Sequence, residues 1–349
     1  MRKSIRRAMA ILLSVLVLAG FGTTPVYADQ AAETPAEETM GEAEGTASVQ
    51  KVEGEGFETP EEALEAYILG LIHGDFSEML AACAVESFVD HYDIEAQISR
   101  MKSIMPVSYS ESYLPVESDF TRQMNLETRR TALANMAKLQ YLILNQSKIM
   151  TQNQGAAVIP YKEEEYETVR DMIDDIYFPN GTTATENLTF NKEFVPPLLL
   201  APVYYRASNV ANLQRQANVA GAEKCMDLVA ILYVQDEPYL ICASLLRYDS
   251  RWYMSSGSLL GMMLGLPSNS GNLISSAEFG IPEEIREYFF NMRFRKAVDR
   301  VTTALNEIDI TALPGLSKEE MDAFWTKEVE KIYSEYAEEM EYLEESGLF

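Results

Sequence analysis

The sequence is poor in the residues that metal and disulfide chemistry needs. It has 3 cysteines and 2 histidines among 349 residues. Such scattered cysteines are too few for a disulfide scaffold, and their odd number leaves at least one free thiol, which we expect to be a small buried hydrophobe. A His-rich zinc site would need both histidines together with carboxylates. The sequence therefore predicts neither a metal nor a cofactor.

Positive charge and catalytic motifs are also scarce. Lysine and arginine total 28 against 54 acidic residues, a formal net charge of −26. This balance argues against nucleic acid or an anionic membrane as a partner, because both need positive patches. A solvated acidic surface is the simplest explanation, and a cationic partner such as a basic peptide or metal ions is the sharper one. No phosphate loop, HExxH, CxxC or GxSxG motif is present.

One long apolar run is present, near the N-terminus. Basic residues at positions 2–7 precede an apolar stretch over Ala8–Gly22 and a small-x-small site at 26–28. This pattern predicts a secretory signal peptide over residues 1–28, and the apolar run is shorter than the ~20 residues of a spanning helix. Phe21 stands where a lipoprotein precursor carries cysteine. We expect an exported protein without a stable membrane anchor after cleavage.

Residues 29–56 are acidic and contain almost no large apolar side chains, which predicts a disordered tether. A helix then begins at a capping box, Thr59-Pro60-Glu61-Glu62, and ends at Gly74. Asp75 caps a second helix. A third is expected over roughly 84–101.

The most informative stretch lies over residues 224–260, and it predicts a three-stranded antiparallel meander. Residues 225–234 and 239–248 have strand length and composition, and Asp249-Ser250 marks a tight turn before a third strand. The alternating residues of the first strand are apolar on both faces, so we expect helices or a second copy of the chain to cover the second face. With the first turn placed at residues 236–237, Cys225 is expected opposite Tyr248.

Two of these segments resemble a known family. FETPEEALEAYILGLIHGDFSEMLAAC is similar to the opening helices of the nuclear-transport-factor-two-like superfamily, which includes polyketide-cyclase-like proteins and ketosteroid isomerase. VAILYVQDEPYLICASLLRYDSRWYMSSGSLLG resembles that family's closing strands, where an aromatic pair such as Trp252-Tyr253 follows a tight turn. The resemblance implies an α+β fold in which a curved antiparallel sheet is wrapped by N-terminal helices into a cone.

The distance between the two segments exceeds what a minimal domain of that type needs. We expect a cone-like domain over residues 57–266 with a helical insertion at about 103–190, followed by a C-terminal helical extension over 267–349 packed on the domain. Within the insertion, a long helix to about Asn145, a strand at 156–161 and a helix at 162–177 are predicted. Prolines at 196, 197 and 202 interrupt one or two edge strands over 188–206.

The extension is predicted to form two helices. The first runs from Pro282 to about Glu307, and the second starts at a capping box, Ser317-Lys318-Glu319-Glu320. The second helix carries an apolar and aromatic stripe, which is more often core than a partner site. Its larger members are Met321, Phe324, Trp325, Ile332, Tyr336, Met340 and Leu343.

The candidate site residues are few. Asp227 is a carboxylate in an apolar strand, and in cone-fold enzymes acidic residues that project into the cone transfer protons, so the resemblance permits that role here. The simpler interpretation is that Asp227 faces water at the frayed start of its strand. His91 lies beside Asp90, which could tune it as a base, although neighbouring residues on a helix point in different directions. Tyr233, Trp252 and Tyr253 are candidate ligand-binding residues.

Two function classes remain open. The first is an exported, non-catalytic binding or accessory protein for an unknown small molecule, a peptide or a second copy of the chain as a homodimer. The alternative is a cofactor-independent acid–base enzyme, an isomerase, dehydratase or cyclase. A roomy cavity where Asp227, a histidine and tyrosines converge would favour the enzyme. A cone filled by Leu, Ile and Met would favour binding.

Overall fold

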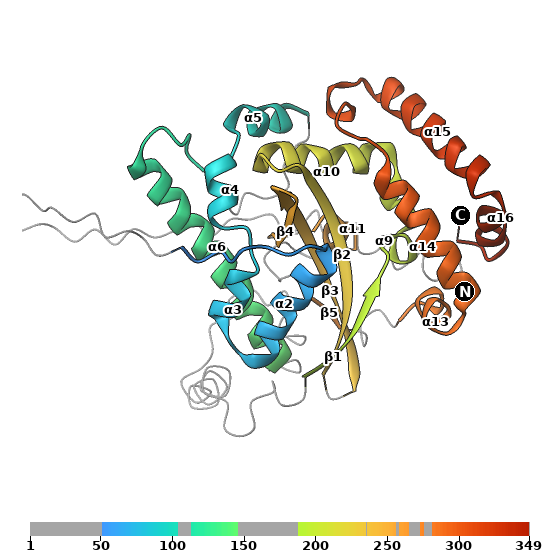
Figure 1. Cartoon of the computed structure of the whole chain (residues 1–349), viewed down its shortest axis with the longest axis horizontal. Coiled ribbons are helices and arrows are strands. Elements are labelled where there is room, and N and C mark those ends of the chain that lie inside the picture. Colours follow the sequence, from blue (N-terminus) through green and yellow to red (C-terminus); the bar gives the residue numbers. More distant parts are fainter. Residues whose placement is uncertain are drawn as a thin grey trace, which may run out of the picture. The chain divides into compact units, whose positions relative to one another are not determined.

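The predicted meander lies at the centre of the structure, a computed structural model that describes residues 51–103, 113–145, 188–234, 236–255, 258–264, 273–275 and 281–348. The curved antiparallel sheet has the order β1-β2-β3-β4, and β5 also pairs with β3 (Figure 1). Its strands are β1 (Leu188–Val195), β2 (Lys224–Val234), β3 (Glu237–Tyr248), β4 (Arg251–Met254) and β5 (Leu273–Ser275). The chain is therefore of the α+β class, as the sequence predicted.

The two tight turns fix the register of the meander. Tyr248 pairs with Arg251, and both intervening residues have positive φ, 48° at Asp249 and 63° at Ser250, which is the geometry of a type I′ hairpin. In the first turn, Val234 pairs with Glu237, one residue earlier than the sequence suggested. The predicted partner of Cys225 was therefore wrong by two residues: Cys225 lies opposite Leu246.

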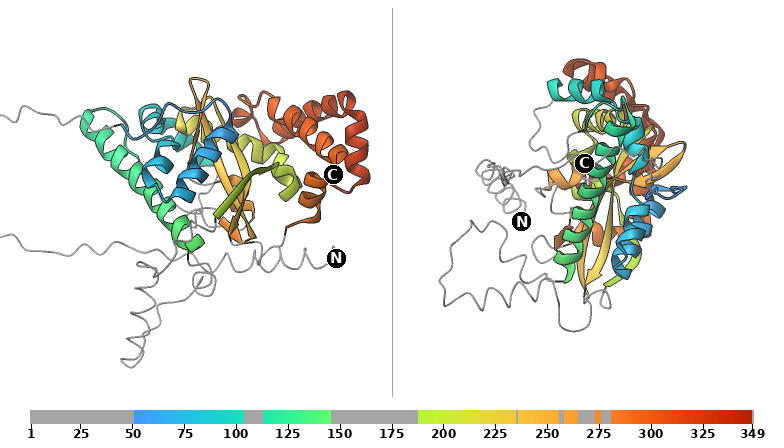
Figure 2. Two further views of the ribbon diagram at one scale, coloured as in Figure 1. Left: turned by 60° about the horizontal axis from the view of Figure 1, so that its bottom comes forward. Right: turned by 90° about the vertical axis from the view of Figure 1, so that its left-hand side faces the viewer.

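The prediction that both faces of β2 are covered is confirmed. Side chains of alternate residues enter two separate cores, with Leu228, Ala230 and Leu232 in one and Val229 and Ile231 in the other. N-terminal helices cover the first face, and α10 with the C-terminal helices covers the second (Figures 1 and 2). All three cysteines are free and buried, as expected of small hydrophobes.

The N-terminal helices begin and end where their caps predict. Helix α2 (Pro60–His73) starts at the Thr59 capping box and ends at Gly74, whose φ is 67°, and Asp75 caps α3 (Phe76–Ala81). The expected third helix is instead two, α4 (Glu86–His91) and α5 (Ile94–Ser103). The break occurs at Asp93, whose carboxylate accepts the N–H groups of Glu95 and Ala96 and so caps a new helix.

Helix α6 (Asp119–Asn145) confirms the long helix predicted in the insertion. Leu126, Leu133 and Ala137 lie on the buried side of this helix, whereas Phe120, near its N-terminus, is 72% exposed. The first turn of this helix therefore extends beyond the core. The strand predicted at 156–161 and the helix predicted at 162–177 lie outside the described residues.

Of the one or two strands predicted over 188–206, one is present, β1, and the proline-rich stretch after it begins helical turns. Proline occupies the first turn of both α9 (Pro197–Leu200) and η3 (Pro202–Tyr205), where its missing N–H costs no hydrogen bond. Helix α10 (Ala207–Ala220) follows, and its buried residues join the core on the second face of the sheet. No sequence signal was assigned to α10.

The C-terminal helices are more divided than the sequence suggested. Asn291 caps α14 (Met292–Glu307), which separates it from α13 (Glu283–Phe290), and a break at Tyr336 separates α15 (Lys318–Glu335) from α16 (Ala337–Glu345). The predicted Ser317 capping box is present. Two short elements, α11 (Leu259–Met263) and η5 (Leu313–Gly315), complete this part of the chain.

Val52–Phe349 forms one compact unit. Among the helices that the structure describes, none combines the length and apolar character needed to cross a bilayer.

Candidate functional site

Asp227 is buried on the second face of the sheet rather than facing water, so the simpler sequence interpretation was wrong. The residue lies three positions inside β2, and its side chain is 1% exposed. One carboxylate oxygen accepts the Ser244 hydroxyl at 2.5 Å and the other accepts the Leu260 N–H at 2.8 Å. Its own N–H donates to the Tyr204 hydroxyl at 3.2 Å. The carboxylate thus joins β2, β3 and the start of α11.

Burial dominates the electrostatics of this carboxyl group. Loss of hydration raises the pKa of Asp227 from an ordinary value of 3.8 to about 6, although hydrogen bonds from Ser244, Leu260, Ser258 and Tyr204 favour the charged form. A pKa in that range suits acid–base chemistry. In the structure, however, both carboxylate oxygens accept hydrogen bonds from protein groups, one from the Ser244 hydroxyl and the other from the Leu260 N–H.

The histidines lie away from this aspartate. His91 is exposed at the end of α4, where its Nδ1 lies 2.8 Å from the Ser87 carbonyl oxygen and its ring lies 5.4 Å from that of Tyr248. The neighbouring Asp90 binds Arg122 instead of His91. His73 lies 2.8 Å from Glu78 on the surface. No histidine is therefore positioned to exchange a proton with Asp227.

The candidate ligand-binding aromatics do not converge. Trp252 packs in the core under the N-terminal helices, whereas Tyr253 and Tyr233 belong to the opposite face of the sheet. The Tyr233 hydroxyl donates to Glu193 at 2.6 Å on the neighbouring β1. Since adjacent strand residues point to opposite faces, Trp252 and Tyr253 cannot line one pocket.

A buried charged network, which the sequence analysis did not identify, anchors the start of the compact unit. Glu53, assigned by sequence to the tether, is 5% exposed and accepts the N–H groups of Val85 and Ser87 at the start of α4. Glu86 accepts the Glu53 N–H at 2.9 Å and a 2.6 Å hydrogen bond from Arg130. The buried carboxylates thus cap a helix and hold the incoming chain, which is a structural role.

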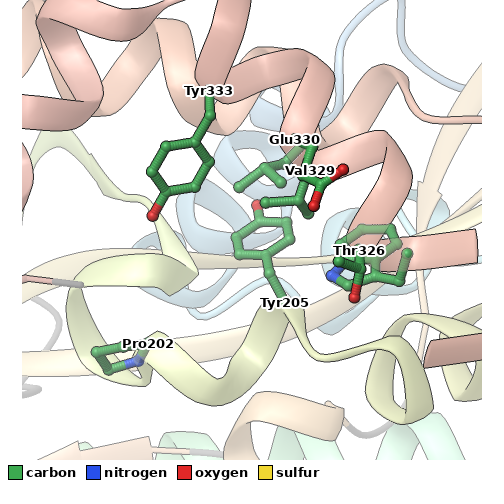
Figure 3. A pocket seen from close by; sticks show the side chains of 8 residues that line it. Pro202, Tyr205, Thr326, Val329, Glu330 and Tyr333 are labelled. Carbon is green, nitrogen blue, oxygen red and sulfur yellow. The ribbon is translucent and has the colours of Figure 1, made fainter. Parts of the chain in front are cut away.

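A hollow on the surface, with no strand residue in its lining, is more open to a ligand than the buried surroundings of Asp227. We call it the aromatic groove: it has a volume of about 380 Å³ and lies between η3 on one wall and α15 on the other, with α14 contributing one residue. Figure 3 shows Tyr205 on η3 facing the Glu330 and Tyr333 side chains from α15. Its lining residues are Pro202, Tyr205, Leu305, Trp325, Thr326, Val329, Glu330 and Tyr333.

Helical spacing explains the α15 wall. Trp325, Val329 and Tyr333 recur every fourth residue and therefore share one side of the helix. Trp325 belongs to the predicted apolar stripe, but Tyr333 and Tyr205 were not identified from sequence. The Tyr205 hydroxyl donates to the Asn306 side chain at 3.0 Å, which fixes that ring against α14. The groove thus has a rigid aromatic wall opposite a helical one.

The phenols of the groove stay neutral, and its wall carries a carboxylate. Burial raises the pKa of Tyr205 and of Tyr333, and a hydrogen bond to Glu344 raises that of Tyr333 further. Glu330 lies exposed on α15.

A separate hollow of about 20 Å³ is lined partly by Lys224, whose ammonium donates to the Asn306 backbone oxygen at 2.8 Å.

Within the described ranges, no group of three or more His, Cys, Asp or Glu side chains is placed to hold a metal ion. Asp227 lines neither hollow.

Comparisons with known proteins give one distant likeness. No family model matches the chain. No curated protein matches it either. Among solved structures, a cystatin-like protein from Ruminococcus gnavus is similar over 74% of this chain, with 15% sequence identity and a TM-score of 0.38. The matched region spans 50% of that protein's chain.

Proposed function

We propose that the chain is an exported, non-catalytic binding protein and that the aromatic groove is its ligand site. The observation that carries this proposal is the contrast between the sheet and the groove. Alternating residues of β2 and β3 fill both faces of the sheet with apolar side chains. The groove, in contrast, has about 380 Å³ of space and no lining residue from a strand.

Several properties of the groove suit a binding role. Its volume falls in the range of ~300–1,000 Å³ that is usual for small-molecule sites, and apolar and aromatic side chains dominate its lining. Besides the polar groups of its aromatic side chains, the lining includes Thr326 and Glu330. A few polar groups in an apolar hollow give orientation and specificity.

We also propose that the chain belongs to the nuclear-transport-factor-two-like superfamily. The order of elements supports this assignment, since helices α2 and α3 precede an antiparallel meander and pack under it. The meander ends in Trp252-Tyr253 after a type I′ turn, which is the aromatic pair on which the resemblance depends.

Fluorine NMR tests the binding role, because the chain contains only 2 tryptophans. Trp325 lines the groove and Trp252 lies in the core on the other face of the sheet. In protein labelled with 5-fluorotryptophan, a mixed set of cationic, neutral and anionic small molecules should include compounds that shift the Trp325 resonance and leave that of Trp252 in place. A set that moves neither resonance, or moves both together, would contradict the proposal.

An acid–base enzyme is the second candidate, and the raised pKa of the Asp227 carboxyl is the observation in its favour. It is supported less well, because both carboxylate oxygens accept hydrogen bonds from protein groups. If any isomerase, dehydratase or cyclase turnover is found, Asp227→Asn should abolish it, and unchanged turnover would remove this residue from the mechanism.

A further inference from the structure

The aromatic groove combines aromatic rings with one carboxylate that lacks a cationic partner in the described part of the chain. Tyr205, Trp325 and Tyr333 line it from two elements, and Glu330 lies on the same wall as two of these rings. Within the described part of the chain, no lysine, arginine or histidine forms an ion pair with Glu330. The adjacent Lys331 is held by Glu328 at 2.6 Å. The carboxylate charge of the groove is therefore available to a ligand.

The chemistry of these walls favours a cation. The faces of tryptophan and tyrosine rings carry negative electrostatic potential and attract ammonium and guanidinium groups. A carboxylate beside them adds a direct ion pair. An anionic ligand would face both the rings and Glu330, so it would be repelled. A neutral apolar ligand would leave the Glu330 charge partly desolvated without a partner.

Resting on the proposed function, we propose that the groove binds the arginine or lysine side chain of a basic segment in a partner polypeptide. A polypeptide fits better than a small organic cation because the attraction reaches beyond the groove. The chain carries a formal net charge of −26, which favours encounter with a partner that carries several positive charges. The wall helix itself has further acids at Glu328 and Glu335.

Titration of the full mature chain with defined peptides tests this inference. The probe is acetyl-Gly-Arg-Gly-Arg-Gly-amide, and its control replaces both arginines with citrulline, which keeps the shape and removes the charge. We expect the arginine peptide to shift the fluorotryptophan resonance of Trp325 and to bind at least about fivefold more tightly than the citrulline peptide, as one desolvated cation–π contact allows. Choline in place of the peptide tests whether the groove prefers a small organic cation, and we expect it to bind more weakly than the arginine peptide.

Matched variants assign the effect to the groove. Glu330→Gln should weaken the arginine peptide about three- to fivefold, since an exposed ion pair contributes little more. Glu127→Gln removes the same charge from an exposed position on α6, which packs on the other face of the sheet, and should leave the affinity for the peptide unchanged. Tyr333→Leu should weaken binding about two- to fivefold. Tyr333→Phe keeps the aromatic ring and should therefore bind the peptide as tightly as the wild type.

The outcomes separate this inference from the proposed function. Equal binding of the arginine and citrulline peptides, or equal losses in Glu330→Gln and Glu127→Gln, would overturn the cationic ligand while Trp325 still reports an occupied groove. Tighter binding of choline than of the peptide would overturn the polypeptide partner. A Trp325 resonance that responds to no compound of any charge would overturn both proposals.

Discussion

Replacing Asp227 by asparagine should remove a pH dependence from the stability of the fold. Asparagine has nearly the same shape, and its side-chain oxygen can accept the Leu260 N–H while its amide group faces the Ser244 hydroxyl, which can rotate to accept. The variant therefore keeps the hydrogen bonds that join β2, β3 and α11. It loses only the titration of a buried group.

The sign and size of the effect follow from the pKa of Asp227. Burial raises that pKa from 3.8 to about 6, so between these pH values the folded chain holds a proton that the unfolded chain has lost. The stabilising contribution of this group to the folded state is fully present below pH 3.8, and it is lost as the pH rises through about 6. The difference of roughly two pKa units corresponds to about 3 kcal/mol.

Urea unfolding at a series of pH values measures this effect. The free energy of unfolding of the wild type minus that of Asp227→Asn should fall by about 3 kcal/mol between about pH 3.5 and about pH 7.5. Taking the difference cancels groups that titrate equally in both proteins, and Asp322→Asn, at an exposed position on α15, controls for the lost charge. A difference that stays flat across the pH range would refute the burial of an ionisable group at this position.

Three further substitutions test the fold. Ser250→Gly should raise the free energy of unfolding by about 0.5–1 kcal/mol in urea titrations, because Ser250 has a φ of 63° that glycine adopts without strain. Thr59→Ala should lower it by about 1 kcal/mol, since the capping bond to the Glu62 N–H is lost. Arg129→Met should lower it by about 3 kcal/mol, because Arg129 is only 1% exposed and its guanidinium donates to the Ala84 carbonyl and to Ser255. An unchanged midpoint in any of the three would count against the contact named.

Local signals explain what the sequence predicted. The capping boxes at Thr59 and Ser317 and the Asp249-Ser250 turn each act within a few residues, and the structure confirms all three. The apolar faces of β2 likewise predicted a strand covered on both sides. Such features depend on residues that are close in the chain.

Other elements lack a local signal or carry a misleading one. Helix α10 begins at Ala207, and the residue before it, Arg206, makes no side-chain capping hydrogen bond, so no capping signal marks its start. Prolines 197 and 202 were interpreted as strand breakers, although proline also fits the first turn of a helix. The first turn was misplaced by one residue because the second strand was expected to start at Tyr239, whereas β3 begins at Glu237 and pairs there with Val234.

The candidate site shows the same limit. The carboxylate of Asp227 was found from sequence, but its burial depends on Tyr204 and Leu260, which come from other segments. The aromatic groove depends on Tyr205 and Tyr333, which lie far apart in the chain. An aromatic stripe on α15 looks the same in sequence whether it is fully covered or partly open, so only tertiary packing distinguishes a core from a groove.

The location of the proposed ligand site is tested most directly by a crystal structure of the protein soaked with a small-molecule library. We expect electron density for bound compounds between η3 and α15, in contact with Tyr205, Trp325 or Tyr333. Density against the carboxylate of Asp227, in space opened between the sheet and α11, with none in the aromatic groove, would contradict this expectation.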